Sequence, residues 1–189
     1  VPLTFPPIPT GLPPLPNVLP QRPGHPGAPV AQGDLAKSFA TSISPWVVTL
    51  DALEPFRAPA FRRPEGDPAP LPYLDGGGVR ANAGIDLRLE VALSTARMRQ
   101  LQHAPHVVSR SSMRHLYWTI GQLLTHHASN GCNLRPGDLL GTGTVSGPTR
   151  ESRGCLLELT WRGSEPLELP SGETRRFLED GDEVVIRGY

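Results

Sequence analysis

Hydrophobic and polar residues alternate most regularly between positions 84 and 93. In GIDLRLEVAL every second residue is apolar, and the apolar set is Ile85, Leu87, Leu89, Val91 and Leu93. A period of two residues is typical of a β-strand that buries one face and exposes the other. The pattern therefore predicts a half-buried strand.

A helical period follows, over residues 112–129. Its apolar positions recur every three or four residues and are Met113, Leu116, Tyr117, Ile120, Leu123, Leu124 and His127. Ser111 or Ser112 can cap the first turn, and Asn130 followed by Gly131 is a common helix end. The pattern predicts one main helix.

Short strands are predicted on both sides of these elements. Upstream, KSFATSISPWVVTL (37–50) is rich in β-branched and aromatic residues and is interrupted at Pro45, before a long proline- and glycine-rich loop over residues 57–78. Downstream, the candidates are DLLGTGTVS (138–146), CLLELTW (155–161), RRFL (175–178) and EVVIRGY (183–189), separated by turn sequences. Many strands and one helix predict a mainly β domain.

Proline content sets the domain boundary. The sequence holds 23 prolines, and eleven of them lie between Pro2 and Pro29. Such a density cannot build a core, so residues 1–33 are predicted to be an extended, polyproline-like or disordered segment. Residues 34–189 are long enough for one domain with its own core.

Charge and cysteine content exclude several classes of protein. The formal net charge is zero and no long basic block occurs, which argues against a nucleic-acid partner. No apolar run approaches the roughly eighteen residues that span a bilayer. The two cysteines, Cys132 and Cys155, form no CxxC pair, which argues against a zinc ribbon or disulfide framework and favours a reducing, cytoplasmic compartment.

The stretch LTHHASNGCNLRPGDLLGTGTVSG (124–147) concentrates candidate chemistry. His126 and His127 are adjacent on a helix, so their rings diverge by about 100°, and no HExxH pattern is present. A structural role, with one ring packed and one solvated, is favoured over a metal site. The segment GTGTVSG lacks the Gly-Lys-Ser/Thr of a phosphate loop, but its glycines allow a ligand to approach closely, and its threonine hydroxyls could face that ligand.

Two single residues stand out by composition and context. Of the 18 basic residues, only Lys37 is a lysine, and an ammonium group offers a compact charge that guanidinium does not. Glu158 lies between Leu157 and Leu159. Its carboxylate is either a solvent-facing strand residue, which the pattern favours, or a partly buried base.

Several longer strings resemble one enzyme family. They are YWT, LTHH, NGCNLRPGDLL and FLEDGDEV in residues 112–189, together with KSFATSISPWVVTLDALEPF and PLPYL upstream. These strings resemble the catalytic domain of the fumarylacetoacetase family, and the resemblance covers residues 34–189. It implies a mixed β-roll.

The resemblance also implies an activity. Members of this family hydrolyse a carbon–carbon bond of 4-fumarylacetoacetate, a β-diketo acid, to fumarate and acetoacetate in the last step of tyrosine and phenylalanine catabolism. A His–Glu pair activates water, a divalent metal (Mg or Ca) holds the diketone, and cationic groups stabilise the leaving group. The resemblance further implies a cytoplasmic homodimer.

Four family positions match residues of this chain. Glu158 falls on the glutamate that orients the attacking water, and Thr144 falls on a substrate-binding threonine. Lys37 falls on the lysine that is both catalytic and part of the metal region, and Thr41 falls on the threonine beside that metal.

The chain also departs from the family. The family places its catalytic histidine and most metal carboxylates before the lysine, whereas residues 1–33 contain no Asp or Glu and only one histidine, His25. A hard cation takes about six oxygen ligands, several from carboxylates. The chain begins at Val1 and stops at Tyr189, where the family continues. The expectation is a fragment, or a mis-spliced or frame-shifted form, with an incomplete roll and no activity on its own.

Two alternatives stay open at this point. The first is another enzyme of the same superfamily: an acylpyruvate hydrolase, a decarboxylase or an isomerase. The second is a non-catalytic binding protein whose PPIPTGLPPLP segment (6–16) offers a PxxP motif to an SH3-like partner.

Overall fold

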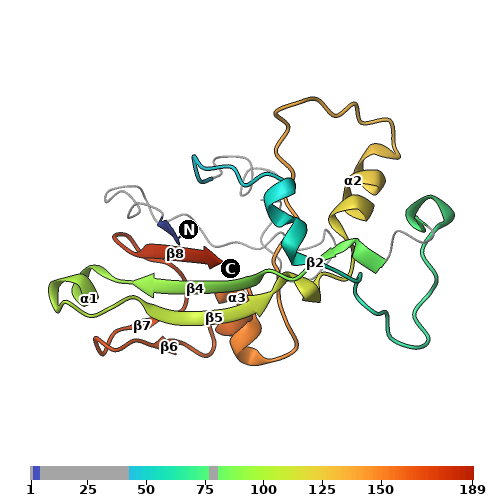
Figure 1. Cartoon of the computed structure of the whole chain (residues 1–189). Coiled ribbons are helices and arrows are strands. Elements are labelled where there is room, and N and C mark those ends of the chain that lie inside the picture. Colours follow the sequence, from blue (N-terminus) through green and yellow to red (C-terminus); the bar gives the residue numbers. More distant parts are fainter. Residues whose placement is uncertain (1, 5–42, 77–80) are drawn as a thin grey trace.

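The largest sheet of the molecule is antiparallel, with the strand order β1-β8-β4-β5 (Figure 1). The computed structural model describes residues 2–4, 43–76 and 81–189. The four strands are β1 (Pro2–Thr4), β4 (Arg88–Ser94), β5 (His106–Ser112) and β8 (Glu183–Gly188). The prediction of a β-rich domain is confirmed. Within the described residues, no helix has both the length and the apolar character that crossing a membrane requires.

The alternating stretch forms strand structure, as predicted. It divides into β3 (Gly84–Ile85) and β4, with Asp86 and Leu87 between them. β4 occupies the middle of the sheet, paired to β8 on one side and β5 on the other. A bulge opposite β5, between Val91 and Ala92, interrupts the alternation, and from Ala92 onward consecutive residues are buried.

The first strand lies inside the predicted proline-rich segment. Leu3 pairs with Ile186 of β8, and Thr4 pairs with Val185. Residues 2–4 are therefore extended and bonded to the sheet, while the prediction for residues 1–33 as a whole stays a prediction. Residues 5–33, including the PxxP motif, lie outside the described residues.

Several short elements connect and flank the main sheet. They are η1 (Asp51–Phe56), β2 (Arg57–Ala58), η2 (Pro72–Leu74), α1 (Ala96–Gln100), η4 (Met113–His115), η5 (Arg150–Ser152), β6 (Leu167–Glu168) and β7 (Thr174–Arg175). β2 pairs with β3, and β6 pairs with β7. The predicted loop over residues 57–78 is irregular apart from β2 and η2 in its described part.

The main helix is shorter than predicted. α2 spans Ile120–Ala128, whereas the pattern predicted a start near residue 112. The physical reason is a capping box: the Thr119 hydroxyl accepts from the Gln122 amide, and the Gln122 side chain accepts from the Thr119 amide. Ser112 instead caps the 3-10 turn η4. The C-terminal prediction is close, since Gly131 has a φ of 86° just beyond the helix.

The prediction of a strand over residues 155–161 is wrong. Residues Leu156–Leu159 form the short helix α3 instead. Leucine and glutamate are good helix formers, and the first β-branched residue of this run, Thr160, comes only after the helix. An apolar run this short does not distinguish a strand from a helix by its period.

Three other strand predictions fail or hold only in part. Residues 138–146 form no strand, and Gly143 has a φ of 76°, which interrupts an extended conformation. Residues 43–50 also form no strand, and residues 37–42 lie outside the described residues. Of RRFL, only Arg175 belongs to a strand, β7. The prediction for EVVIRGY is confirmed by β8.

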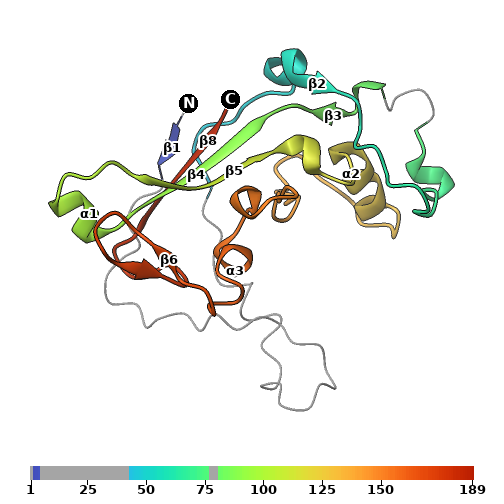
Figure 2. The ribbon, with the colours of Figure 1, turned by 90° about the horizontal axis from the view of Figure 1, so that it is seen from below.

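One hydrophobic cluster of the core packs on one face of the main sheet. Leu93 of β4, Met98 of α1 and Leu169 pack together, with Val108 and Val184 beside them. Figure 2 shows the β6–β7 pair and α3 on this same side of the sheet. α3 therefore lies on the same face of the sheet as the hydrophobic cluster, and α2 lies past the end of β5.

A buried ion network ties β7 to the end of the sheet. Arg175 forms two bonds with the Asp182 carboxylate, at 2.9 and 3.0 Å, and the Asp182 side chain is only 1% exposed. Glu173 contacts Arg175 at 3.3 Å and also accepts from the hydroxyls of Ser171 and Thr95. These hydroxyls, followed by the positive charge of Arg175, lower the pKa of Glu173. Every carboxylate of this network therefore has partners within the chain.

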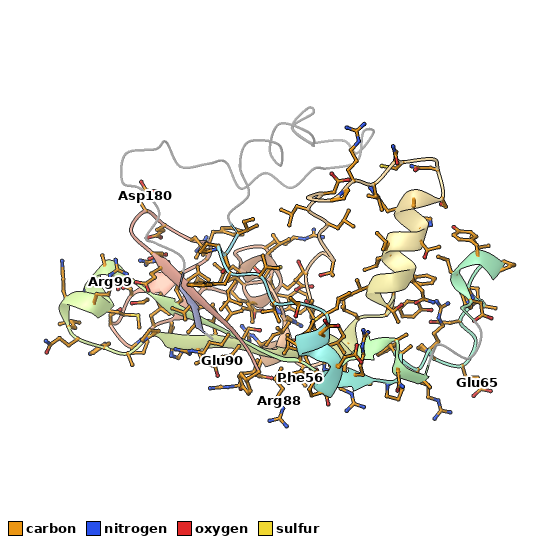
Figure 3. The ribbon with its side chains drawn as sticks, turned by 45° about the horizontal axis from the view of Figure 1, so that its top comes forward. Phe56, Glu65, Arg88, Glu90, Arg99 and Asp180 are labelled. Carbon is orange, nitrogen blue, oxygen red and sulfur yellow. The ribbon has the colours of Figure 1, made fainter. Side chains whose placement is uncertain are left out.

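A second ion network joins three strands of the main sheet. Glu90 of β4 contacts Arg110 of β5 at 3.1 Å and Arg187 of β8 at 2.8 Å. Figure 3 shows Glu90 along the sheet, while Arg99 and Asp180 lie near the end that carries α1. At that end the Arg99 guanidinium donates to the Gly181 carbonyl at 2.7 Å.

Candidate active site

The irregular segment 142–146 borders a hollow of about 310 Å³. Its polar lining residues are His115, Thr142, Thr144, Ser146 and Glu158. The residues come from three parts of the chain: η4, the glycine-threonine segment and α3. The structure therefore brings together Thr144 and Glu158, the two predicted site residues that lie within the described ranges.

Glu158 sits in the first turn of α3 and is half-buried. The Ser146 hydroxyl donates to its Oε2 atom at 2.6 Å, and the Cys155 thiol approaches the same oxygen at 3.5 Å. The favoured prediction, a solvent-facing strand residue, is wrong in both respects. The carboxylate is partly withdrawn from solvent and is held by donors from its own chain.

Gly154 explains how the glycine-threonine segment reaches α3. A Cβ atom at position 154 would lie 2.6 Å from the Val145 carbonyl oxygen and 2.7 Å from a methyl carbon of Thr144. Only glycine allows this approach without displacement of the backbone. The Gly154 amide also donates to the Ser146 hydroxyl oxygen at 3.0 Å. The contact places residues 144–146 directly beside the start of α3.

A second glycine brings His115 to the hollow. A Cβ atom at position 147 would lie 2.9 Å from the His115 ring and 2.6 Å from the Ser152 hydroxyl oxygen. Ser152 is buried, and its carbonyl accepts from the Gly147 amide at 2.8 Å. The sequence carries no signal for His115, because a single histidine in a 3-10 turn matches no motif. Its place depends on a contact across 32 residues of chain.

Tyr117 and Trp118 form an aromatic wall of the hollow. The Arg63 guanidinium lies 4.7 Å from the ring centre of Tyr117 and 4.2 Å from that of Trp118. The Tyr117 hydroxyl donates to Asp67 at 2.7 Å, and this hydrogen bond raises the pKa of Tyr117. The same two rings also line a neighbouring hollow of about 450 Å³. The wall is thus held from behind by the irregular segment that follows β2.

The Cys155 thiol lies beside Glu158. Burial raises the pKa of Cys155, and the negative charge of Glu158 raises it further, although the Glu158 amide and the Thr144 hydroxyl oppose the shift. A thiol that keeps its proton acts as a weak donor. Cys155 therefore supports the carboxylate and is a poor nucleophile in this position.

His126 and His127 take separate partners. The His126 Nδ1 atom lies 2.9 Å from the Tyr73 hydroxyl, and the two rings stack. The His127 Nε2 atom lies 3.4 Å from the Cys132 sulfur. Both histidines are exposed, and the His126 ring stacks on Tyr73, so the expectation of one packed and one solvated ring holds only in part. The two rings take different partners, as neighbours on a helix do.

The described residues do not fit a divalent metal. Across residues 2–4, 43–76 and 81–189 there is no group of three or more His, Cys, Asp or Glu side chains that could hold one. Glu158 is the only carboxylate among the described residues that line the hollow. Mg²⁺ and Ca²⁺ take six or more oxygen ligands. Lys37 and Thr41, the predicted residues of the metal region, lie outside the described residues.

Comparisons with known proteins point to one family. The family model described as fumarylacetoacetate (FAA) hydrolase C-terminal matches residues 25–188. The chain is 54% identical over 154 residues to a fumarylacetoacetase of Arabidopsis thaliana, a match that covers 82% of this chain and 34% of the relative. It is 52% identical over 155 residues to the Bos taurus fumarylacetoacetase and 50% identical over 155 residues to that of Homo sapiens. Each of these two matches covers 82% of this chain and 35% of the relative. The chain spans about a third of the length of these relatives.

Proposed function

Because the chain belongs to the fumarylacetoacetate hydrolase C-terminal family, we propose that it forms part of the catalytic domain of a fumarylacetoacetase. The reaction is hydrolysis of a carbon–carbon bond of 4-fumarylacetoacetate to fumarate and acetoacetate. The observation that carries this proposal is the identity of about half of the matched residues to enzymes of that name. The hollow that joins Thr144 to Glu158 supports it independently.

The proposed reaction begins with water. Water adds through its oxygen to the carbonyl carbon at the fumaryl end, and it gives up a proton as it does so. The carbon–carbon bond next to that carbonyl then breaks, and its electron pair leaves with the acetoacetate part as an enolate. This enolate carbon takes up a proton. Base catalysis of the first step contributes roughly 10²–10⁴-fold in rate.

Each predicted site residue has a proposed role in this sequence. Glu158 orients the water, since its carboxylate lines the hollow and is partly withdrawn from solvent. The Thr144 hydroxyl binds a substrate oxygen from the opposite segment. Lys37 stabilises the enolate, because a compact ammonium charge suits a small developing anion. Lys37 and Thr41 belong to the metal region; residues 1–42 hold a single acidic residue, Asp34, so this chain does not itself supply the carboxylate ligands of that region.

The overall assembly is also a proposal. The antiparallel order β1-β8-β4-β5, with α3 beneath the sheet, supports a mixed β-roll of which these elements are a part. We propose a homodimer in the cytoplasm, in keeping with two unpaired cysteines.

The test is a chimera. The matched 155 residues of the bovine relative are replaced by the corresponding residues of this chain, and loss of 4-fumarylacetoacetate is followed by its absorbance with magnesium or calcium present. We expect turnover by the chimera and none by the isolated chain. A folded chimera that leaves the substrate intact would refute the proposed function. Turnover by the isolated chain would show instead that this chain supplies every group that the reaction requires.

A further inference from the structure

Ser146 connects the backbone of one segment to the carboxylate of another. Its hydroxyl oxygen accepts from the Gly154 amide at 3.0 Å, and its proton is donated to Oε2 of Glu158 at 2.6 Å. A hydroxyl has one proton and can rotate to suit its neighbours. An amide proton directed at the oxygen removes that freedom, so the hydroxyl proton points toward Glu158.

The donors meet only one of the two carboxylate oxygens. Ser146 and the weaker Cys155 thiol both reach Oε2. Among the residues that the structure describes, nothing donates to Oε1. A carboxylate can accept about four hydrogen bonds, so Oε1 keeps its full capacity. The two oxygens of Glu158 are thus unequal: one is anchored, and the other is open.

Tight packing at Gly154 holds the Ser146 hydroxyl in place. Gly154 packs against the Val145 carbonyl with no room for a side chain. The position of the Gly154 amide, which donates to Ser146, is therefore fixed. A bond of 2.6 Å from a hydroxyl to a carboxylate is within the range of strong charge-assisted hydrogen bonds. Without it, a glutamate side chain that is half-exposed regains rotamer freedom.

We propose that Ser146 is a positioning residue that directs Oε1 of Glu158 toward the attacking water. This inference rests on the proposed function, because it assigns the geometry of the same carboxylate. The hydroxyl itself touches neither water nor substrate. It fixes which oxygen of Glu158 is used and where that oxygen lies. A misplacement of about 1 Å at a reacting group can cost roughly 10²-fold in rate.

Kinetics of the chimera test the proposal. Ser146→Ala removes the donor, and we expect kcat to fall about tenfold or more while KM changes less than about threefold. Ser146→Thr keeps the hydroxyl and should retain most of kcat. The matched control is Ser164→Ala, whose hydroxyl donates to the Trp161 carbonyl and not to Glu158. Unchanged kcat in Ser146→Ala, or an equal loss in Ser146→Thr, would overturn the proposal.

A second readout is independent of activity. Amide hydrogen exchange at Gly154 is measured by NMR in the 189-residue chain. We expect faster exchange in Ser146→Ala, where the amide loses its acceptor, and unchanged exchange in Ser146→Thr. Equal exchange in all three proteins would show that the bond is absent and would overturn the positioning role. If the unsubstituted chimera is inactive, the proposed function fails, while the exchange result still decides whether Ser146 holds Gly154.

Discussion

Two of the polar clusters described above differ in what they leave open. In the network of β7, Arg175 and Asp182 saturate one another in the interior, and Glu173 is held by two hydroxyls and a guanidinium. In the hollow beside α3, Glu158 is held through one oxygen only, and Thr144 is exposed. A saturated cluster stabilises the fold, whereas a cluster with spare hydrogen-bonding capacity can bind something else.

Substitution of Arg175 should cause the largest loss of unfolding free energy. Arg175→Met leaves the Asp182 carboxylate buried without its partner, and such a change costs about 3–5 kcal/mol of unfolding free energy. Urea unfolding measures this loss. Arg110→Met is the control, because the Arg110 side chain is 67% exposed and Glu90 keeps its second partner, Arg187, so we expect a loss of about 0.2–1 kcal/mol, as for exposed pairs. Equal losses in the two variants would contradict the distinction between a saturated interior network and a surface one.

Substitution of Glu158 should leave stability nearly unchanged and reduce activity. Glu158→Gln keeps the shape and an oxygen that can accept from Ser146, so we expect little change in the melting temperature. In the chimera, however, kcat should fall by roughly 10²-fold or more, because the amide is no base. Glu165→Gln is the matched control, since that carboxylate is exposed and pairs with Arg150 away from the hollow. Near-normal turnover in Glu158→Gln would remove this residue from the proposed site.

Substitution of Gly154 tests the close approach of the two backbone segments at the hollow. In Gly154→Ala the new methyl group would meet the Val145 carbonyl, and we expect a loss of about 1–3 kcal/mol of unfolding free energy, as for other overpacked sites. Gly141→Ala, in the same irregular segment, meets no atom within 4 Å and should be neutral. A neutral Gly154→Ala would mean that the two segments do not approach as closely as the structure shows.

The smallest expected effect is a pH dependence from Glu173. Its pKa in the folded chain is lowered, chiefly by Ser171 and Thr95, so it stabilises the fold above the ordinary pKa of glutamate. That contribution is lost as the pH falls through the lowered folded value. The stability difference between the wild-type chain and Glu173→Gln should therefore shrink on acidification between those two values. A difference that is independent of pH would contradict this role.

Sequence patterns predicted β4 and β8 but not β5, and they missed the parts of the fold that depend on tertiary contacts. β4 and β8 follow from alternation and β-branched residues, which are local properties. α3 was missed because a short leucine-rich run fits both kinds of element. The Arg175–Asp182 pair was invisible, since RRFLEDGD has the composition of a solvated turn.

Only some residues of the candidate site could likewise be predicted from the sequence. Resemblance pointed to Thr144 and Glu158, and the structure places both on one hollow. Ser146 and His115 could not be predicted, because each depends on a close backbone approach at a glycine, Gly154 or Gly147. Such an approach follows from the path of the whole chain and leaves no periodic signal. The roles of Lys37 and Thr41 stay predictions.

Glu90 has a consequence for the order in which the sheet assembles. Its bond to Arg110 spans 20 positions of sequence, and its bond to Arg187 spans 97. Closing the shorter loop costs less entropy, so β4 and β5 are expected to pair first and β8 to dock afterwards. A slip of one residue by β8 would turn Arg187 to the other face and leave half of the Glu90 carboxylate without its partner. Glu90 therefore serves as a register check on β8, the later of the two neighbours of β4 to pair with it.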